Sequence, residues 1–383
     1  MSGGAAPGVP GGVELEGADA NAIGRAVKEL WKAAGADAGE SVRRACVMNL
    51  VVVLAGEWQS GDTFRALDAL AASHPARTVV VIPDAAMPAG VARSEVSIFC
   101  AVMPGPGRHV CAERIVLRAA ADTVGHLHQT VLALCVDELE RVVWWRVAGG
   151  DPTGILGRLA PHVDGLVVDS RDWARDASSP EAVLSMRGDA ELPLRDLDWG
   201  RLTLWREMIA QAFDAAETRA ALGALNRVRV GVAAGPDGAA SLSALLLLGW
   251  LADRLGWHLA PTRMGEAAAT VPCVMQGVSG ADGRPVAVEL VADAHPAAER
   301  GMVSVILRSE SPRAEFSFAR TGKGNTVAAC TEAEGIAGLC RMVDFGVCTT
   351  ETLLARELNY GGRDAGYERA LANASRMGRM ATR

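Results

Sequence analysis

The chain has 383 residues, of which half are hydrophobic and only 4% aromatic, and its formal net charge at neutral pH is −7. This length is enough for two domains, and the negative charge gives no general attraction to nucleic acid or to an anionic membrane. The sequence contains neither an apolar run long enough to cross a bilayer nor the basic start and apolar stretch of a secretory signal. We therefore expect a cytoplasmic protein with no nucleic-acid or membrane partner.

The N-terminal part of the chain predicts a flexible tail, a helix and two buried strands. Residues 1–19 are rich in Gly, Pro and Ala, which is typical of a tail. Residues 20–34 place their apolar side chains on one helical stripe. The runs 45–54 and 77–82 are apolar and β-branched throughout, as in strands covered on both faces, and a helix is predicted between them at 61–74.

The next stretch continues the alternation of strands and helices. Strands at 94–103 and 110–119 flank a turn rich in Pro and Gly, so we expect them to pair as a hairpin. The other predicted elements are helices at 122–135 and 152–160 and strands at 141–147 and 164–170. The pattern favours an α/β domain over 20–170, with a mostly parallel sheet and helices on its faces.

The remaining sequence predicts a different kind of domain. Residues 171–225 are interpreted as a connecting segment with one long helix at 201–219. From 226 to 383 the pattern favours a smaller α+β domain with antiparallel strands. Its predicted strands are 227–234, 272–279, 285–292, 301–307, 314–320 and 326–330, and its predicted helices are 242–257 and 349–374.

The segment "RVVWWRVAGGDP" ends a predicted strand with bulky and charged side chains. Side chains alternate along a strand, so Trp144 and Arg146 share one face and Trp145 takes the other. One Trp can fill the core while its neighbour, or Arg146, reaches the carboxyl end of the strand, where open α/β sheets meet ligands and partners. The candidate docking or ligand-binding residues are Trp145, Arg146, Asp169, Ser170 and Arg171, with Arg206 on the long helix as an alternative docking element.

A glycine-rich turn offers a possible anion site. The segment "AAGPDGAASLSA" follows a strand and opens a helix, and its candidate residues are Gly235, Gly238 and Ser241. It matches neither of the two common phosphate-binding glycine motifs, so a plain turn is the simpler interpretation. The functional alternative is an enzyme or sensor that binds a phosphorylated sugar or a nucleotide between the two domains.

Other catalytic patterns are weak. His126 and His128 are two apart on a predicted helix and cannot share one metal ion, so we expect no metal site. Asp196 and Asp198 precede a helix, where capping explains them better than acid–base catalysis. We expect no catalytic residues and no cofactor.

The eight cysteines contain no C-x-x-C pair and are expected to be mostly buried thiols. The candidate for a redox pair is Cys340 with Cys348.

Several sequence blocks, taken in order, resemble the OpcA family of glucose-6-phosphate dehydrogenase assembly proteins. The resemblance runs from about residue 43 to residue 372 and covers both predicted domains. Its blocks are "CVMNLVVV", "SHPARTVVVI", "VCAERIVL", "VVWWRV", "GLVVDSRDW", "LDWGRLTLWREMIAQAFD", "LLLLGWLADRLGW" and "LLARELNYGGRDAGYERAL". None of them is a catalytic motif, so the specificity lies in their joint order.

This resemblance implies a non-catalytic protein that binds glucose-6-phosphate dehydrogenase and favours its active oligomeric state. NADP and sugar phosphate would then be ligands of the dehydrogenase, in the oxidative pentose phosphate route. An activator of this kind must bind the active form of its target more tightly than the inactive form. The oligomeric state of the chain itself is left open.

Overall fold

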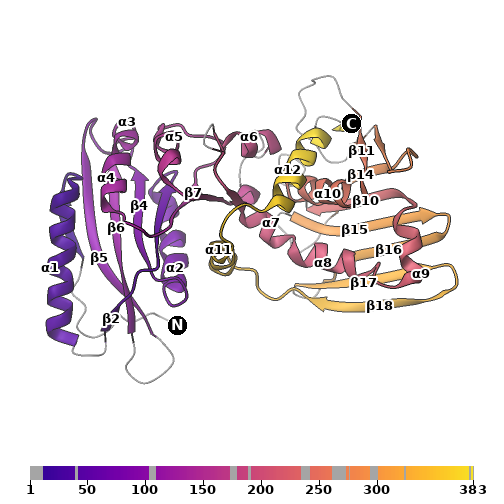
Figure 1. Ribbon diagram of the computed structural model, residues 1–383, viewed down its shortest axis with the longest axis horizontal. Helices are drawn as coiled ribbons and strands as arrows, with labels where there is room; N and C mark the ends of the chain where they lie inside the picture. The colour runs from indigo at the N-terminus through magenta and orange to yellow at the C-terminus, as the bar shows by residue number, and fades with distance from the viewer. Residues whose placement is uncertain are drawn as a thin grey trace. The chain divides into compact units, whose positions relative to one another are not determined.

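The computed structural model describes residues 12–38, 42–102, 109–172, 179–188, 191–233, 242–260, 273–275, 277–293, 301–322, 325–378 and 381–382. The chain forms two compact units, and each unit is assembled from three stretches (Figure 1). The first unit comprises Met1–Val168, Met186–Arg195 and Thr349–Gly362. The second comprises Asp169–Ser185, Asp196–Cys348 and Arg363–Arg383.

The first unit is built on a nine-stranded sheet in the order β1-β5-β6-β4-β3-β7-β8-β9, with β2 beside β6. Strands β3, β4, β6, β7 and β8 run parallel, and β1 and β5 add antiparallel pairs. The strands are β1 (Val13–Glu16), β2 (Val42–Arg44), β3 (Met48–Leu54), β4 (Ala76–Pro83), β5 (Ala92–Val102), β6 (His109–Ala119), β7 (Arg141–Arg146), β8 (Gly165–Val168) and β9 (Leu194–Asp196). The mostly parallel sheet and the β5–β6 hairpin confirm the sequence-based expectation.

Helices cover both faces of this sheet. Helices α1 (Ala20–Ala38) and α2 (Ser60–Leu70) lie on opposite sides of it (Figure 1). Helix α4 packs beside α1, and α11 packs beside α2. The other helical segments are α3 (Ala121–Val124), η3 (Gly125–Leu127), α4 (His128–Leu134), α5 (Ile155–Leu159), η4 (Ala160–His162), α11 (Thr350–Asn359) and the short turn η2 (Glu57–Gln59). Every residue of β3 is accordingly buried, as its uninterrupted apolar sequence predicts.

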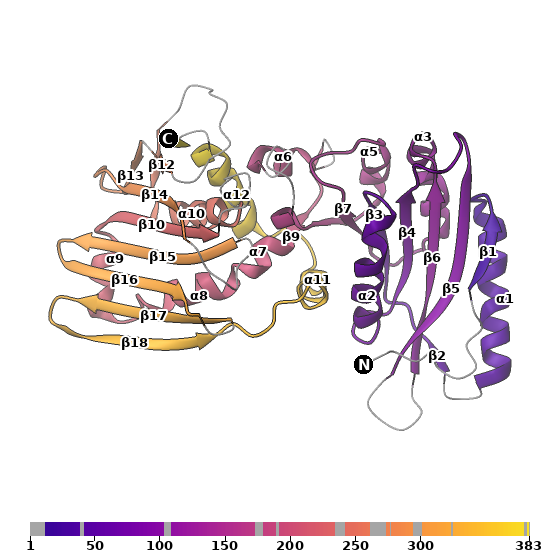
Figure 2. The ribbon, with the colours of Figure 1, turned by 180° about the vertical axis from the view of Figure 1, so that it is seen from behind.

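The second unit contains an eight-stranded sheet in the order β18-β17-β16-β15-β10-β14-β12-β19 (Figure 2). It is antiparallel except for the pair β10–β14. Its strands are β10 (Leu225–Ala233), β12 (Cys273–Met275), β14 (Ala287–Ala292), β15 (Gly301–Glu310), β16 (Arg313–Arg320), β17 (Thr326–Ala333), β18 (Ile336–Asp344) and β19 (Ala381–Thr382), and β11 (His258–Leu259) pairs separately with β13 (Val278–Ser279). The α+β character predicted for this part of the chain is confirmed.

The helices of the second unit are α6 (Pro180–Ser185), α7 (Leu197–Arg201), α8 (Thr203–Gln211), α9 (Ala216–Leu222), α10 (Leu242–Leu255) and α12 (Ala365–Gly378), with the short turn η5 (Ser170–Asp172). Helices α10 and α12 pack closely because Gly249 has no side chain: a Cβ there would lie 2.1 Å from the carbonyl oxygen of Ala370. Side chains on the buried face of α10 are almost all apolar, which makes it a core helix.

Two predicted helices are shorter than expected. The helix predicted at 201–219 is broken before Ala216, because Ala215 adopts an extended backbone (φ −72°, ψ 143°). The helix predicted at 349–374 is divided into α11 and α12 at a Gly-Gly pair, where Gly362 has φ of 83°. A positive φ is accessible to glycine at little cost, so this pair ends one helix before the next begins.

The expectation that most cysteines are thiols is wrong for half of them. Cys100 pairs with Cys111, and Cys330 with Cys340, each as a disulfide across two adjacent antiparallel strands. Cys340 therefore bonds to Cys330 and not to Cys348, because strand register places Cys330 directly opposite it. Cys348 is an exposed free thiol.

Within the described ranges, none of the helices has the length and apolar character needed to span a membrane.

Candidate functional site

An exposed tryptophan lies at the carboxyl edge of the parallel sheet in the first unit. Trp58 follows β3 within the turn η2, and its relative solvent exposure is 79%. Arg146 ends the neighbouring strand β7, where it is in register with Leu54, the last residue of β3. Arg118, near the same end of β6, forms ion pairs with Glu57 at 3.1 Å and with Glu95 at 3.2 Å. Trp58 is not among the candidate site residues predicted from the sequence. Its neighbours are glycine and polar residues, and it does not belong to an apolar stripe of a predicted helix, which could have indicated that it is exposed.

Arg146 is held in a fixed orientation at this edge. Its guanidinium donates a hydrogen bond to the hydroxyl oxygen of Thr63 in α2. The same group lies 5.0 Å from the ring centroid of Trp144, within cation–π range. The backbone carbonyl of Arg146 accepts a hydrogen bond of 3.0 Å from the Gln59 side chain. The guanidinium of this half-buried arginine is thus held by Thr63 and Trp144, so little side-chain entropy is lost if a partner contacts it.

Both tryptophans of β7 are core residues. Trp144 and Trp145 are fully buried on opposite faces of the strand. The structure therefore places the ring of Trp145 where it supports the sheet, and of this segment only Arg146 reaches the edge.

The other three residues of the predicted edge belong to the second unit and have internal partners. Both carboxylate oxygens of Asp169 accept hydrogen bonds from Arg201, at 2.7 and 2.8 Å. Ser170, which begins η5, is buried, whereas Arg171 in the middle of η5 is half-buried. Their proposed role in docking or ligand binding stays a prediction.

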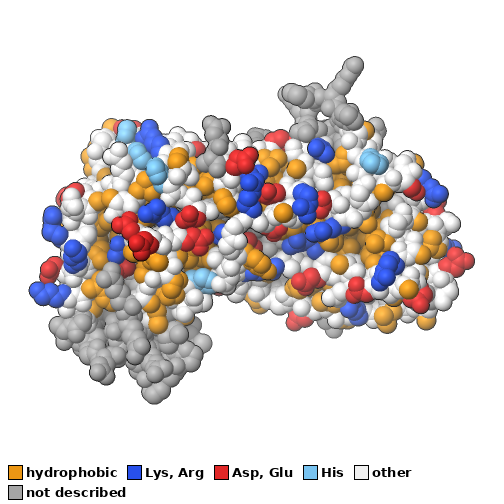
Figure 3. Space-filling view, in the orientation of Figure 1, with side chains coloured by type: hydrophobic (Ala, Val, Ile, Leu, Met, Phe, Trp, Pro, Cys, Tyr) orange, Lys and Arg blue, Asp and Glu red, His pale blue; other side chains and the backbone are white. Residues whose placement is uncertain are grey.

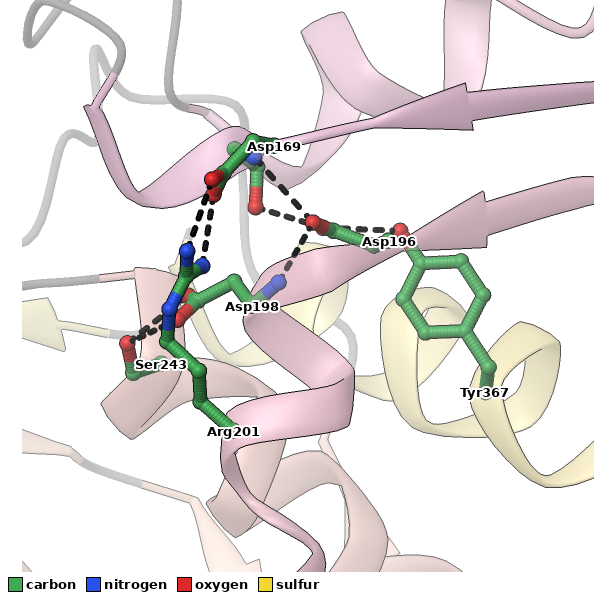
Figure 4. A network of polar contacts seen from close by, with 7 residues as sticks. Asp169, Asp196, Asp198, Arg201, Ser243 and Tyr367 are labelled. Atoms are coloured by element: carbon green, nitrogen blue, oxygen red, sulfur yellow. Dashed lines mark hydrogen bonds and ion pairs between the residues drawn. The ribbon is translucent and has the colours of Figure 1, made fainter. Parts of the chain in front are cut away.

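A buried carboxylate network organises this part of the second unit (Figure 4). Asp196 ends β9 and caps α7, accepting a hydrogen bond of 2.9 Å from the backbone N–H of Asp198. The backbone N–H and hydroxyl of Ser170 also donate to Asp196, and the hydroxyl of Tyr367 donates to it at 3.1 Å. The capping role expected for Asp196 is confirmed, with four donors in place of one.

Asp198 is the second buried acid of the network. Its two carboxylate oxygens lie 2.9 and 2.7 Å from the hydroxyl of Ser243 in α10. Burial, followed by the charge of Asp196, raises the pKa of Asp198 to about 7, although Arg201 and Ser243 oppose the rise. Burial is also the main reason that the pKa of Asp196 is raised to about 6. The two carboxyl groups repel each other when both are charged, so the charge of one favours the protonated form of the other.

The network can hold a proton, but it cannot reach a substrate. Asp196 and Asp198 have almost no exposed surface, and their partners come from η5, α7, α10 and α12. Catalytic acids and bases must contact the reacting groups. We therefore interpret this cluster as the polar connection between four elements of the second unit.

Arg206 is also committed to its own unit. Its guanidinium lies 3.4 Å from the ring centroid of Trp199 and donates to the hydroxyl of Thr203 at 3.0 Å. Trp199 donates from its indole nitrogen to Asp364 at 2.8 Å. Arg206 is half-buried, so part of its side chain remains accessible as an alternative docking element.

The remaining candidates give no site within the part of the chain that the structure describes. The glycine-rich turn with Gly235, Gly238 and Ser241 lies outside the described residues. The described residues contain no group of three or more His, Cys, Asp or Glu side chains arranged to hold a metal ion. On the face shown in Figure 3, acidic and basic side chains intermingle, without a large area of one sign.

Two family models match successive parts of the chain. Residues 67–187 match the model described as the glucose-6-phosphate dehydrogenase subunit N-terminal domain, and residues 192–371 match the model for its C-terminal domain. Both models carry the family name OpcA.

Curated relatives agree with this match. The chain is 28% identical over 322 residues to the putative OxPP cycle protein OpcA of Synechocystis sp., covering 80% of this chain and 64% of that protein. It is 27% identical over 335 residues to the protein of the same name from Nostoc punctiforme, covering 83% and 68%. The chain therefore spans about two thirds of the length of these relatives.

Among solved structures, an oxidoreductase from Sinorhizobium meliloti is 11% identical with a TM-score of 0.45, covering 87% of this chain and 89% of that one. Levoglucosan dehydrogenase in its apo form is 12% identical with a TM-score of 0.46, covering 86% and 96%. The family models and the curated relatives, which span both halves of the sequence in order, show that the chain belongs to the OpcA family.

Proposed function

We propose that this protein is a non-catalytic assembly factor and allosteric activator of glucose-6-phosphate dehydrogenase. The observation that carries the proposal is the ordered match of both halves of the chain to the two domains described for a subunit of that dehydrogenase. The name of the curated relatives, which refers to the oxidative pentose phosphate cycle, supports the same role.

The geometry of the first unit supports a docking role at the carboxyl edge of its sheet. Trp58 is exposed there, and Arg146 is held beside its strand by Thr63 and Trp144. Trp and Arg are the residue types that contribute most to binding energy when they become buried at an interface. We propose that Trp58 and Arg146 contact the dehydrogenase, and that they do so more closely in its active form.

The acidic groups of the second unit support a non-catalytic role. The most strongly perturbed carboxyl groups, Asp196 and Asp198, are enclosed and bonded to other residues of the same unit. An acid with a shifted pKa in an open cleft would favour an enzyme, whereas an acid with a shifted pKa in a protein core favours a structural role.

The proposal is tested by mixing the purified chain with the dehydrogenase of the same organism. The rate of NADPH formation is recorded with and without the chain, and the size of the complex is measured by size-exclusion chromatography with light scattering. We expect the chain alone to form no NADPH, and the mixture to show faster turnover and a larger co-eluting species. Turnover by the chain alone would favour the enzyme alternative, and unchanged dehydrogenase activity without co-elution would exclude the activator.

A further inference from the structure

The eight-stranded sheet of the second unit is covered on one face and open on the other. On β16, Phe316 and Phe318 are buried, whereas Glu315 and Ser317 between them are partly exposed. Phe213, which follows α8, packs against Phe316 with 4.3 Å between ring centroids. Figures 1 and 2 show the helices of this unit on one side of the sheet. The side that carries Glu315 and Ser317 therefore faces outward.

Most side chains in the middle of the open face are small or apolar. Strand register places them in rows that run across the sheet. They are Ile306 on β15, Ser317 and Ala319 on β16, Ala328 and Cys330 on β17, and Met342 on β18. Arg229 on β10 lies on the same face and is ion-paired with Asp293, whose carboxylate covers Gly231 and Ser304. Met342 is 62% exposed although it is large and apolar. A sheet face with such side chains is suited to packing flat against another sheet.

One end of the open face carries a row of four charged side chains. Register aligns Arg227 on β10, Arg308 on β15, Glu315 on β16 and Glu332 on β17. Arg308 and Glu315 form an ion pair at 2.6 Å in the middle of the row, and Arg227 and Glu332 lie at its two ends. The two cations thus occupy one half of the sheet and the two carboxylates the other. All four residues line a hollow of about 740 Å³.

We propose that the open face binds a second copy of this chain, sheet against sheet, about a two-fold axis that runs along the strands between β15 and β16. This rotation exchanges β15 with β16 and β10 with β17. It places Arg227 over Glu332 of the second copy and Arg308 over Glu315 of the second copy, and symmetry repeats both pairs. Each charge of the row therefore faces an opposite charge of the same row in the second copy. This complementarity favours a second copy of the chain as the binding partner of the open face.

In the next row, the same operation places Ile306 over Ser317 of the second copy and Arg229 over Cys330 of the second copy. Arg229 keeps its ion pair with Asp293 of its own chain, at 3.6 Å, so its charge stays partnered there. Five strands at a spacing of about 4.8 Å and eight residues at about 3.3 Å give a face of about 600 Å² per copy. The total of about 1,200 Å² is at the lower end of the range for specific interfaces. A dimer in the micromolar range is the expected consequence.

Charge-swap variants test both the dimer and its axis. Arg227→Glu and Glu332→Arg each bring like charges together twice in the dimer, so each should raise the dimer dissociation constant at least about tenfold. The double variant Arg227→Glu/Glu332→Arg restores opposite charges within the same pairs and should return to within about threefold of the wild type. Arg376→Glu, an exposed change on α12 of the same unit, is the matched control and should have no effect.

Sedimentation velocity over a concentration series, at low and at high salt, gives the dissociation constants, and circular dichroism checks that each variant is folded. A wild-type chain that stays monomeric at about 100 µM would overturn the proposal, because the expected dissociation constant is in the micromolar range. Loss of the dimer in both single variants without rescue in the double variant would overturn the proposed axis. Single variants that remain dimeric but no longer bind the dehydrogenase would assign the face to that partner instead.

Discussion

The two large sheets differ in how many of their faces are covered. In the first unit β3, "MNLVVVL", is buried at every residue, whereas in the second unit β16, "RAEFSFAR", alternates between buried and partly exposed side chains. A sheet enclosed on both faces offers a partner only its strand ends and loops, but a sheet enclosed on one face also offers a broad flat surface. The two units are therefore suited to two different kinds of contact.

Charged residues at the ends of strands also differ between the units. In the first unit Arg146 and Trp58 remain at the surface after β7 and β3. In the second unit Asp196 ends β9 and turns inward, where it meets Ser170 and Tyr367. A polar residue after a strand can thus serve recognition or internal connection, and burial distinguishes the two.

The change with the largest expected effect removes the close helix contact on the covered face of the second sheet. A Cβ at Gly249 would lie 2.1 Å from the carbonyl oxygen of Ala370 and 2.9 Å from the nitrogen of Ala374, and neither backbone atom can move without its helix. Gly249→Ala should therefore lower the free energy of unfolding by about 3 kcal/mol. Urea unfolding followed by circular dichroism measures this value. An unchanged midpoint would mean that α10 and α12 separate at little cost.

The second change concerns the buried acids and the pH dependence of stability. The pKa of Asp198 is raised to about 7 in the folded protein, whereas it is near 4 in the unfolded chain. The folded state thus binds more protons between these values, and the stability that the protonated acid provides is lost as the pH rises from about 4 to about 7.

Asp198→Asn, which resembles the protonated acid, should remove this dependence. We expect its stability relative to the wild type to rise by about 2.5 kcal/mol between pH 5 and pH 8. Urea titrations at several pH values give the stability of both proteins. In the difference between them, the contributions of all other titrating groups cancel. Parallel curves for the two proteins would show that Asp198 stays charged in the core.

The third change affects the strand-end contact of the first unit. Trp58→Ala should weaken binding to the dehydrogenase by about 2 kcal/mol, or about 30-fold, and leave stability within about 0.5 kcal/mol because the side chain is exposed. Tyr360→Ala, which removes another exposed aromatic side chain of the same unit, is the matched control. Biolayer interferometry with immobilised dehydrogenase gives both affinities. Equal affinities for the two variants would place the contact elsewhere.

The smallest effect is expected in a helix of the first unit with free space around it. Gly24 lies within α1, and a Cβ there would meet nothing within 4 Å. Gly24→Ala should raise stability by about 0.5 kcal/mol through helix propensity alone. The comparison of Gly24→Ala with Gly249→Ala separates two effects on stability, the conformational freedom of the glycine backbone and the steric clash of a new Cβ atom. A loss of stability would show that α1 needs the flexibility of glycine.

The burial of single elements could be predicted from the sequence, and so could the capping role of Asp196 in the carboxylate network. The apolar runs at β3 and β4 indicate enclosed strands, and Asp196 before a helix indicates a cap. The break between α11 and α12 was also visible as the pair Gly361 and Gly362, but the apolar pattern on both sides concealed it.

Features that depend on pairing between distant segments could not be predicted. The partner of Cys340 is set by the register of β17 against β18. The pKa of Asp198 is raised mainly by burial, and its hydrogen-bond partner Ser243 comes from a helix more than forty residues away. Trp58 is a similar case, because its exposure follows from the turn η2 and not from its own sequence neighbourhood.

The path of the chain has a consequence for gene architecture. The polypeptide leaves the first unit after Val168, returns for Met186–Arg195, and returns again for Thr349–Gly362. Any single truncation point between these stretches would deprive the first unit of β9 or of α11. The two units therefore cannot be produced as two adjacent fragments, nor exchanged between proteins by fusing one continuous segment.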